Sequence, residues 1–159
     1  MPSSHPASTT VILLAGAPKA MTDKLQRLLN AAARLVSETN KFEHGLMQLM
    51  HVDLHWLDML ERIKFKLMSM VHICLHHKVP RYLVDCCIAV SDVASRQHLR
   101  SARRHHLVVP RHSLSSYGRR AIAVAGPAAW NSLSDDLCDP MLSTDSFRRL
   151  LKTHLFSEY

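Results

Sequence analysis

A long stretch of apolar residues at helical spacing, between Leu57 and His77, most constrains how this chain can fold. Its apolar side chains recur every three or four residues and so share one helix face: Leu60, Ile63, Leu67, Met70, Val71 and Cys74. Further apolar residues widen that face beyond the narrow stripe of a surface helix, at Phe65, Met68, Ile73 and Leu75. We therefore expect a helix over 57–77 near the centre of the fold, with other elements packed around it.

Segments on the N-terminal side of this stretch, and directly after it, also predict helices. One is expected from about Met21, capped by Thr22 or Asp23, with an apolar face of Leu25, Leu28, Leu29, Ala32, Leu35 and Val36. A shorter helix is expected over 43–50. Another is expected over 80–87, because the proline at its start fits the first position of a helix.

The C-terminal end predicts a helix with a recognisable start. Ser143 or Thr144 can cap it, and Asp145 then lies in the first turn, where a carboxylate suits the positive end of the helix dipole. Its apolar face consists of Phe147, Leu150, Leu151, His154 and Leu155. A brief helix opened by Pro127 is expected before it.

Between these helical regions, residues 91–126 are polar and basic and contain two short apolar stretches. The stretches cover 107–110 and 121–127, and they could pair as a small β-hairpin that carries arginines at both ends. Periodicity alone does not separate a strand from a buried helix in runs this short. The segment is therefore expected to be either a hairpin or an extended basic connection.

The expected fold class is mainly α, with a helical N-terminal half, a short β-hairpin or extended basic segment, and a C-terminal helix. Residues 1–12 are rich in Ser, Thr and Pro and are expected to be a disordered lead-in. Residues 13–159 are long enough for one domain with its own core. Within it we distinguish a helical part, 13–90, a basic part, 91–126, and a C-terminal helical part, 127–159.

All the excess positive charge of the chain lies in one arginine-rich block. The net charge is +7, from 20 Lys and Arg against 13 Asp and Glu. The block holds seven basic residues and no carboxylate: Arg96, Arg100, Arg103, Arg104, Arg111, Arg119 and Arg120. Without these seven, basic and acidic residues are equal in number. Repulsion within such a block is relieved by phosphates, which indicates a polyanion partner, although a solvated segment that binds nothing would look the same.

The use of arginine rather than lysine favours nucleic acid as that partner. A guanidinium group donates two parallel hydrogen bonds to phosphate oxygens and stacks on exposed bases. Tyr117 is the only aromatic residue within the block, so recognition by base stacking is not supported there. We expect contacts to the backbone of RNA or DNA, weak and without sequence preference.

The sequence offers no catalytic residue and no cofactor site. It lacks a Gly-x-Ser-x-Gly turn and a glycine-rich phosphate loop, and Asp135 and Asp136 are expected to lie in a solvated turn. We therefore expect a protein that is not an enzyme and has no small-molecule substrate. The segment 72–77 contains His72, Cys74, His76 and His77, which keeps zinc binding as a minor hypothesis, but no cysteine pair has the spacing of a zinc ribbon.

Cysteine use and the N-terminal residues indicate an intracellular protein. Adjacent Cys86 and Cys87 cannot easily bridge each other, and all four cysteines, which also include Cys74 and Cys138, are expected to be reduced. The apolar run over 11–15 is too short for a signal peptide or a membrane span. We expect a location in the nucleus or cytoplasm, and no membrane partner.

Five segments, taken together, resemble one known family. They are 13–36, 54–67, 79–87, 95–133 and 142–156, and their order and spacing are similar to the C-terminal, post-palm region of reverse transcriptases from non-LTR, LINE-type retrotransposons of Jockey-like lineages. The resemblance implies thumb-side helices and a basic tail that help to hold template RNA and target DNA. It also implies a fragment, because neither the catalytic palm nor the endonuclease is present in this chain.

The chain departs from the family pattern in three places. The family usually has a proline shortly after its Leu-His-Trp-Leu motif, where this chain reads Asp58, Met59 and Leu60, and another where it has Ser134. Residues 1–12 do not match the expected polymerase sequence. The family's metal-binding aromatic-x-Asp-Asp motif belongs to the palm, so Asp135 and Asp136 do not correspond to it. Trp56 and Trp130 are expected to be core anchors.

Two hypotheses for function remain after these observations. The first is weak, sequence-nonspecific binding of RNA or DNA by a non-catalytic polymerase remnant, with a full-length retrotransposon polymerase as a further partner. The second is a helical protein-interaction module, or an inert fragment with no retained function. An exposed apolar patch on the helices expected over 21–36 or 57–77 would mark a lost partner surface.

Overall fold

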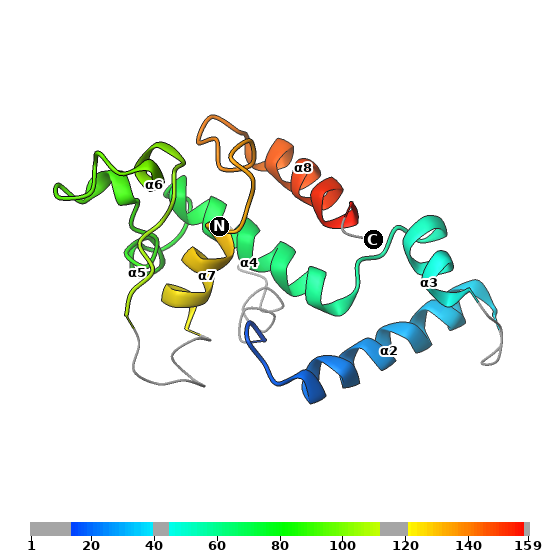
Figure 1. Cartoon of the computed structure of the whole chain (residues 1–159). Helices are drawn as coiled ribbons and strands as arrows, with labels where there is room; N and C mark the ends of the chain where they lie inside the picture. The colour runs from blue at the N-terminus through cyan, green and yellow to red at the C-terminus, as the bar shows by residue number, and fades with distance from the viewer. Residues whose placement is uncertain (1–13, 40–44, 112–120, 158–159) are drawn as a thin grey trace.

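The computed structural model describes residues 14–39, 45–111 and 121–157, and within them the fold is mainly helical. The predicted central helix is confirmed as α4, Met59–Leu75, which runs through the middle of the molecule (Figure 1). Helices α7, Ile122–Trp130, and α8, Thr144–Phe156, pack along it. The N-terminal helix α2, Lys19–Ser37, contacts α4 as well. The expected lead-in, 1–12, lies outside the described residues.

The core forms between α4, α7 and α8. The buried residues of α4 include Met68, Val71 and Cys74, and α8 contributes Phe147, Leu151 and Leu155. Trp130, at the end of α7, is 2% exposed and lies with its ring stacked on that of Phe147, with 5.6 Å between centroids. A wide apolar face on α4 was the sequence's strongest signal, and this three-helix contact buries most of that face. The exception is Leu60, which was expected on the buried face and is 56% exposed.

Helix α8 begins as its sequence predicts. Ser143 is the N-cap, and its hydroxyl oxygen accepts a hydrogen bond from the Ser146 N–H at 3.2 Å. Asp145 lies in the first turn, as expected. The exception on its apolar face is Leu150, which is 48% exposed because only one side of α8 touches α4.

Helix α2 differs from the prediction at its start and on its apolar face. It begins at Lys19 with Pro18 as the N-cap, and the Thr22 hydroxyl donates to the Lys19 carbonyl, so neither expected cap is used. Leu28 is 68% exposed and Leu35 is 82% exposed. The expected inward face of α2 is therefore only partly covered.

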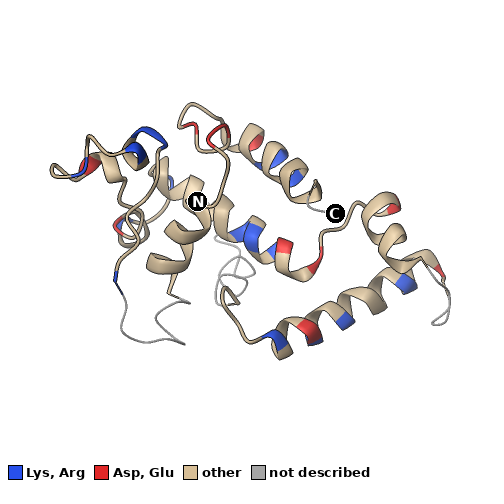
Figure 2. Cartoon of the chain, in the orientation of Figure 1, with Lys and Arg blue, Asp and Glu red and all other residues tan. Residues whose placement is uncertain are grey.

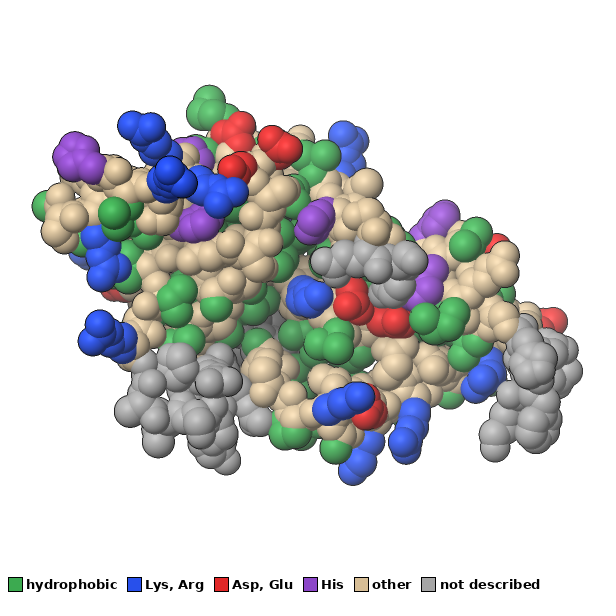
Figure 3. Space-filling model, viewed as in Figure 1, with side chains coloured by type: hydrophobic (Ala, Val, Ile, Leu, Met, Phe, Trp, Pro, Cys, Tyr) green, Lys and Arg blue, Asp and Glu red, His purple; other side chains and the backbone are tan. Residues whose placement is uncertain are grey.

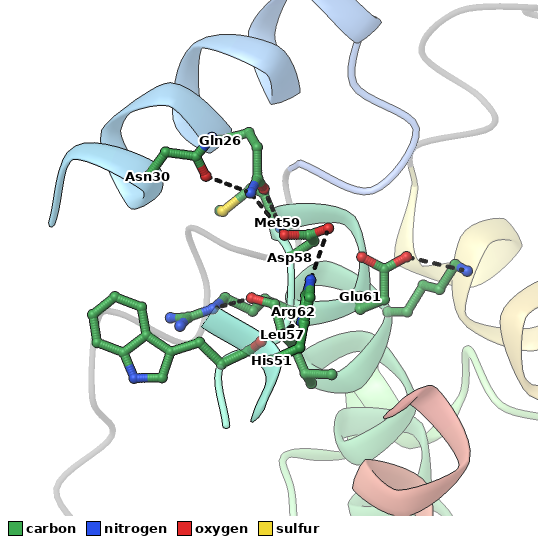
Figure 4. Close-up of polar contacts among 10 residues, drawn as sticks. Gln26, Asn30, His51, Leu57, Asp58, Met59, Glu61 and Arg62 are labelled. Atoms are coloured by element: carbon green, nitrogen blue, oxygen red, sulfur yellow. Dashed lines mark hydrogen bonds and ion pairs between the residues drawn. The ribbon is translucent and has the colours of Figure 1, made fainter. Parts of the chain in front are cut away.

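Glutamine, rather than a large apolar contact, joins α2 to the start of α4 (Figure 4). The Gln26 side chain accepts a hydrogen bond from the Met59 N–H at 2.7 Å and donates one to Asp58 Oδ1 at 2.8 Å. The Met59 N–H is in the first turn of α4 and has no partner within the helix, so a residue of another helix caps it. Asp58 also faces His51, at 3.7 Å between Oδ2 and Nε2.

The connection between α2 and α4 contains a shorter α-helix than expected. Of the helix predicted over 43–50, the structure describes α3, Leu46–Gln48, which continues as one turn of π-helix, η1, Leu49–Asp53. Met50 of η1 is fully buried, which ties this turn to the fold. After α4, the helix predicted over 80–87 is only α5, Arg81–Val84, and proline 80 is its N-cap rather than its first residue.

The β-hairpin prediction is wrong, because its second strand is part of a helix. Residues 122–127 belong to α7, and Pro127 lies within α7 instead of opening a helix. Leu107 forms an isolated antiparallel bridge with Ala89, and no longer strand occurs among the described residues. The small side chains of α7 explain the outcome, since Ala125 and Ala129 pack directly against apolar residues of α4.

Helix α7 approaches α4 closely at Gly126. A Cβ atom at this position would lie 3.0 Å from Val71 Cγ2. We predict that Gly126→Ala lowers the free energy of unfolding by about 1 kcal/mol, because overpacking outweighs the gain in helix propensity. In a Val71→Ala background, which makes room, the same change should raise stability. Chemical denaturation of the four proteins measures both effects.

Ala128→Gly is the matched control, since position 128 is on the exposed side of the same helix. It reports the propensity difference alone, about 1 kcal/mol in favour of Ala. A stabilising Gly126→Ala in the parent chain would show that α7 does not approach α4 this closely.

Candidate nucleic-acid interface

The segment that carries the arginines is fastened to the core by its backbone. Asn131, just after α7, accepts a hydrogen bond at Oδ1 from the Leu107 N–H at 2.8 Å and donates one from Nδ2 to the Leu107 carbonyl at 2.9 Å. The Trp130 indole N–H donates to the His105 carbonyl at 3.1 Å. Leu107 itself is 2% exposed. Leu107, which is buried and makes two backbone hydrogen bonds to Asn131, thus fixes one end of the segment.

The rest of the segment is short turns and one helical turn. The bridge at Ala89 includes two backbone hydrogen bonds, from the Val90 N–H to the His106 carbonyl and from the Val108 N–H to the Ile88 carbonyl. A 3-10 turn, η2, Val90–Asp92, and a short helix, α6, Arg100–Arg103, lie between these paired ends. Only Ala102 of α6 is buried. The loop therefore closes on itself and directs its long side chains outward.

The structure places five of the seven predicted site residues, and all five are exposed: Arg96, Arg100, Arg103, Arg104 and Arg111. Arg119 and Arg120 lie outside the described residues, as does Tyr117. In Figure 3, Lys and Arg side chains project over the α6 region beside red side chains of the loop between α7 and α8. The arginine block is thus a surface feature rather than part of the core.

The arginine block contains no carboxylate of its own, but the fold places one beside it. Arg104 Nε donates to both carboxylate oxygens of Asp135, at 2.9 and 3.0 Å, across 31 positions in the chain. Both side chains are more than half exposed, so the pair adds little stability. It does neutralise part of the block. The expected solvated turn at Asp135 and Asp136 is confirmed, since both are exposed in turns.

Four described arginines keep their charge available for a partner. Arg96, Arg100, Arg103 and Arg111 pair with no carboxylate in the part of the chain that the structure describes. Lys and Arg also lie on α2, α4 and α8 (Figure 2). On α2 and α4, unlike in the arginine block, acidic residues lie between them. An arrangement of exposed guanidinium groups on a fastened loop can bind phosphate groups.

The histidine cluster considered for zinc lines a cavity of about 400 Å³ beside the core. The Nε2 atoms of His72 and His76 are 3.1 Å apart, close enough for one ring to donate a hydrogen bond to the other. Cys74, Cys87 and Cys138 also line this cavity. Among the described residues, however, no three His, Cys, Asp or Glu side chains are grouped so as to hold a metal ion.

Two of the buried thiols next to this cavity, those of Cys87 and Cys138, are poor nucleophiles. Burial, with a smaller effect of Asp135, raises the pKa of Cys138 to about 11. A hydrogen bond with Cys74, followed by burial, raises the pKa of Cys87 as well. A thiol with a raised pKa stays protonated near neutral pH, and the thiolate is the reactive form. Cys87 and Cys138 therefore act as small core residues.

A second basic surface was missed by sequence reasoning. Trp56, expected to be a core anchor, is only half-buried and lines an open hollow together with Arg62 and Lys152. Lys152 is far from Trp56 and Arg62 in the sequence, so no local spacing indicated that the three lie together. The one available signal was Trp56 itself, a large aromatic residue outside any helical apolar face.

Comparison with known proteins identifies no relative of this chain. No family model matches the chain, and no curated protein or solved structure matches it either. No helix in the described residues is long and apolar enough to cross a membrane.

His72 makes stability depend on pH. Its ring is 1% exposed and stacks on Phe147, with 4.3 Å between centroids. Burial, with the nearby charge of His76, lowers the pKa of His72 from 6.5 to about 4. The unfolded chain therefore binds a proton that the folded chain rejects. We predict that stability is full above pH 6.5 and falls by about 3 kcal/mol as the pH drops to 4.

Denaturant unfolding at several pH values measures this effect. His72→Phe keeps an aromatic ring against Phe147 and should remove most of the loss between pH 6.5 and 4. His98→Phe, at an exposed position, controls for the loss of one histidine. Equal pH dependence in the parent and His72→Phe would contradict the assignment.

Proposed function

We propose that this protein binds the phosphate backbone of RNA or DNA, weakly and without sequence preference, through its arginine-rich block. The observation that carries this function is the exposure of every described arginine of the block on a loop fastened to the core at Leu107. Guanidinium groups held this way meet phosphate oxygens without first ordering the backbone that carries them.

The chemistry of the block fits a polyanion better than a protein surface. Its described part is rich in arginine, and apolar side chains there are few, with Leu99 and Val109 as the exposed large ones. Phosphate contacts position a partner but carry no sequence information, so low specificity is expected. The resemblance of 95–133 to a polymerase tail supports the same partner. We assign the protein no catalytic role, and a full-length retrotransposon polymerase remains a proposed second partner.

Replacing the four unpaired arginines tests this function. Arg96→Ala, Arg100→Ala, Arg103→Ala and Arg111→Ala, combined, should reduce binding to a duplex at low salt at least tenfold. In the parent, log K should fall with log salt by about 0.9 per phosphate neutralised on a duplex, and the variant should have a shallower slope. Fluorescence anisotropy with a labelled duplex across a salt series gives both values.

The matched control removes four exposed arginines from the helices α2, α5 and α8: Arg27, Arg81, Arg148 and Arg149. It changes the net charge by the same amount. If both quadruple variants bind equally, net charge rather than the block attracts the nucleic acid. Asp135→Asn, which releases Arg104, should strengthen binding and steepen the salt slope by up to about 0.9.

The exposed side of α2 favours a second candidate function, a helical protein-interaction module. Met21, Leu28 and Leu35 are seven residues apart and 48%, 68% and 82% exposed, so they form a row along one side of the helix. A contiguous exposed apolar row marks an interaction surface in many proteins. Basic side chains flank it at Lys24 and Arg27, which favours an acidic partner surface.

Leu28→Glu combined with Leu35→Glu distinguishes this function from the first. Both positions face solvent, so stability should change by less than about 0.5 kcal/mol. A protein partner captured after nuclease treatment should be lost in this variant and retained in the four-arginine variant. Loss of every captured partner on nuclease treatment would leave nucleic-acid binding as the function.

A further inference from the structure

An open hollow of about 520 Å³ lies where the start of α4 meets the end of α8. The segment before α4 contributes His55 and Trp56, α4 contributes Arg62, Phe65 and Lys66, and α8 contributes Lys152. Its volume is within the range of small-ligand pockets. We call it the Trp56 hollow. Aromatic and cationic side chains share its lining, and no carboxylate lines it among the described residues.

The aromatic wall of the hollow is held in place. The Arg62 guanidinium carbon lies 5.3 Å from the centroid of the Trp56 ring, a cation–π contact. Arg62 is itself fixed, because its Nε donates to the Leu57 carbonyl at 2.8 Å (Figure 4). The backbone N–H of Trp56 donates to the carbonyl of buried Met50 at 2.7 Å. The indole is therefore positioned before any ligand arrives.

Cations surround this wall on two elements. Lys66 and Lys152 are both exposed, and the Lys152 ammonium group lies over the Phe156 ring, with 5.5 Å between Nζ and the ring centroid. A ligand that satisfies the whole lining needs a flat apolar part for Trp56 and Phe65 and a negative charge for Lys66 and Lys152. A hydrocarbon lacks the charge, a cation is repelled, and an acidic side chain lacks the flat part.

We propose that the Trp56 hollow binds one nucleotide unit, with its base against Trp56 and Phe65 and its phosphate near Lys66 and Lys152. Every base has a flat π-face, so stacking on an aromatic side chain is tolerant of sequence. A duplex hides these faces inside its stack. The hollow therefore gives the protein a preference for single strands over duplexes, which the arginine block does not provide.

The identity of the ligand as a nucleotide rests on the lining of the hollow alone. Its identity as a unit of a strand rests on the proposed nucleic-acid function. A free nucleotide has the same chemistry, so the experiment includes both forms. It uses oligo-dT, a phosphodiester backbone of the same length without bases, a duplex, thymidine monophosphate and a poly-glutamate peptide.

Tryptophan fluorescence reports the hollow directly. The chain has two tryptophans, and Trp130 is 2% exposed in the core, so stacking of a base quenches Trp56. Oligo-dT should quench the parent, and the abasic strand and the duplex should not. If thymidine monophosphate quenches as well, the hollow accepts the free nucleotide; if only oligo-dT does, the strand is the ligand. Both results support the hollow.

Two variants test the separate contributions. Trp56→Leu should weaken oligo-dT binding about tenfold and leave abasic-strand binding unchanged, since one stacked base is lost. Lys152→Gln, at an exposed position that leaves the fold intact, should lower the salt slope on a single strand by about 0.7. Tyr82→Leu and Lys24→Gln are the matched controls, because both side chains are exposed and neither lines the hollow.

Several results would overturn the inference. They are equal quenching by the abasic strand, equal quenching by poly-glutamate, or unchanged oligo-dT binding in Trp56→Leu and Lys152→Gln. If those two variants bind like the parent while the four-arginine variant no longer binds the duplex, the nucleotide site in the hollow is contradicted and binding by the arginine block is supported. If the four-arginine variant binds like the parent while Trp56→Leu binds oligo-dT no better than the abasic strand, the nucleotide site in the hollow is supported and binding by the arginine block is contradicted.

Discussion

The packing of α4 against α7 and α8 is the contact on which the other features depend. It buries most of the wide apolar face of α4, and within it Val71 and Gly126 approach each other closely. Around it, His72, Phe147 and Trp130 stack in one aromatic group. Dispersion and the removal of apolar surface from water act over this whole contact, whereas single surface ion pairs contribute little. A helix of small residues, α7, makes the close approach possible.

The same contact organises both proposed binding surfaces. Trp130 and Asn131, at the end of α7, hold the backbone of His105 and Leu107, and so fasten the arginine-bearing loop. At the other end of α4, the docking of α8 brings Lys152 to the same hollow as Trp56. Nucleic-acid binding, as proposed, would therefore be sensitive to core packing even where the core touches no ligand.

Much of the fold could be predicted, and the errors have one physical cause. The centre of α4, the Ser143 cap and the C-terminal apolar face follow from periodicity and capping chemistry, which act within a few residues. The strand predicted over 121–127 and the inward face predicted for Leu28 and Leu35 failed, because burial depends on what the rest of the chain supplies. For the candidate interface, the arginines were evident in the sequence, but the Arg104–Asp135 pair was not.

The sequence by itself determined that this protein is mainly helical, that α4 is central, and that its excess charge is arginine on one segment. These are local properties of composition and spacing. Only the tertiary structure decided which arginines keep their full charge, that α7 is a helix, and that Trp56 lines a hollow with Lys152. Such outcomes depend on contacts between residues distant in the chain, and no pattern within a single segment contains the distances that decide them.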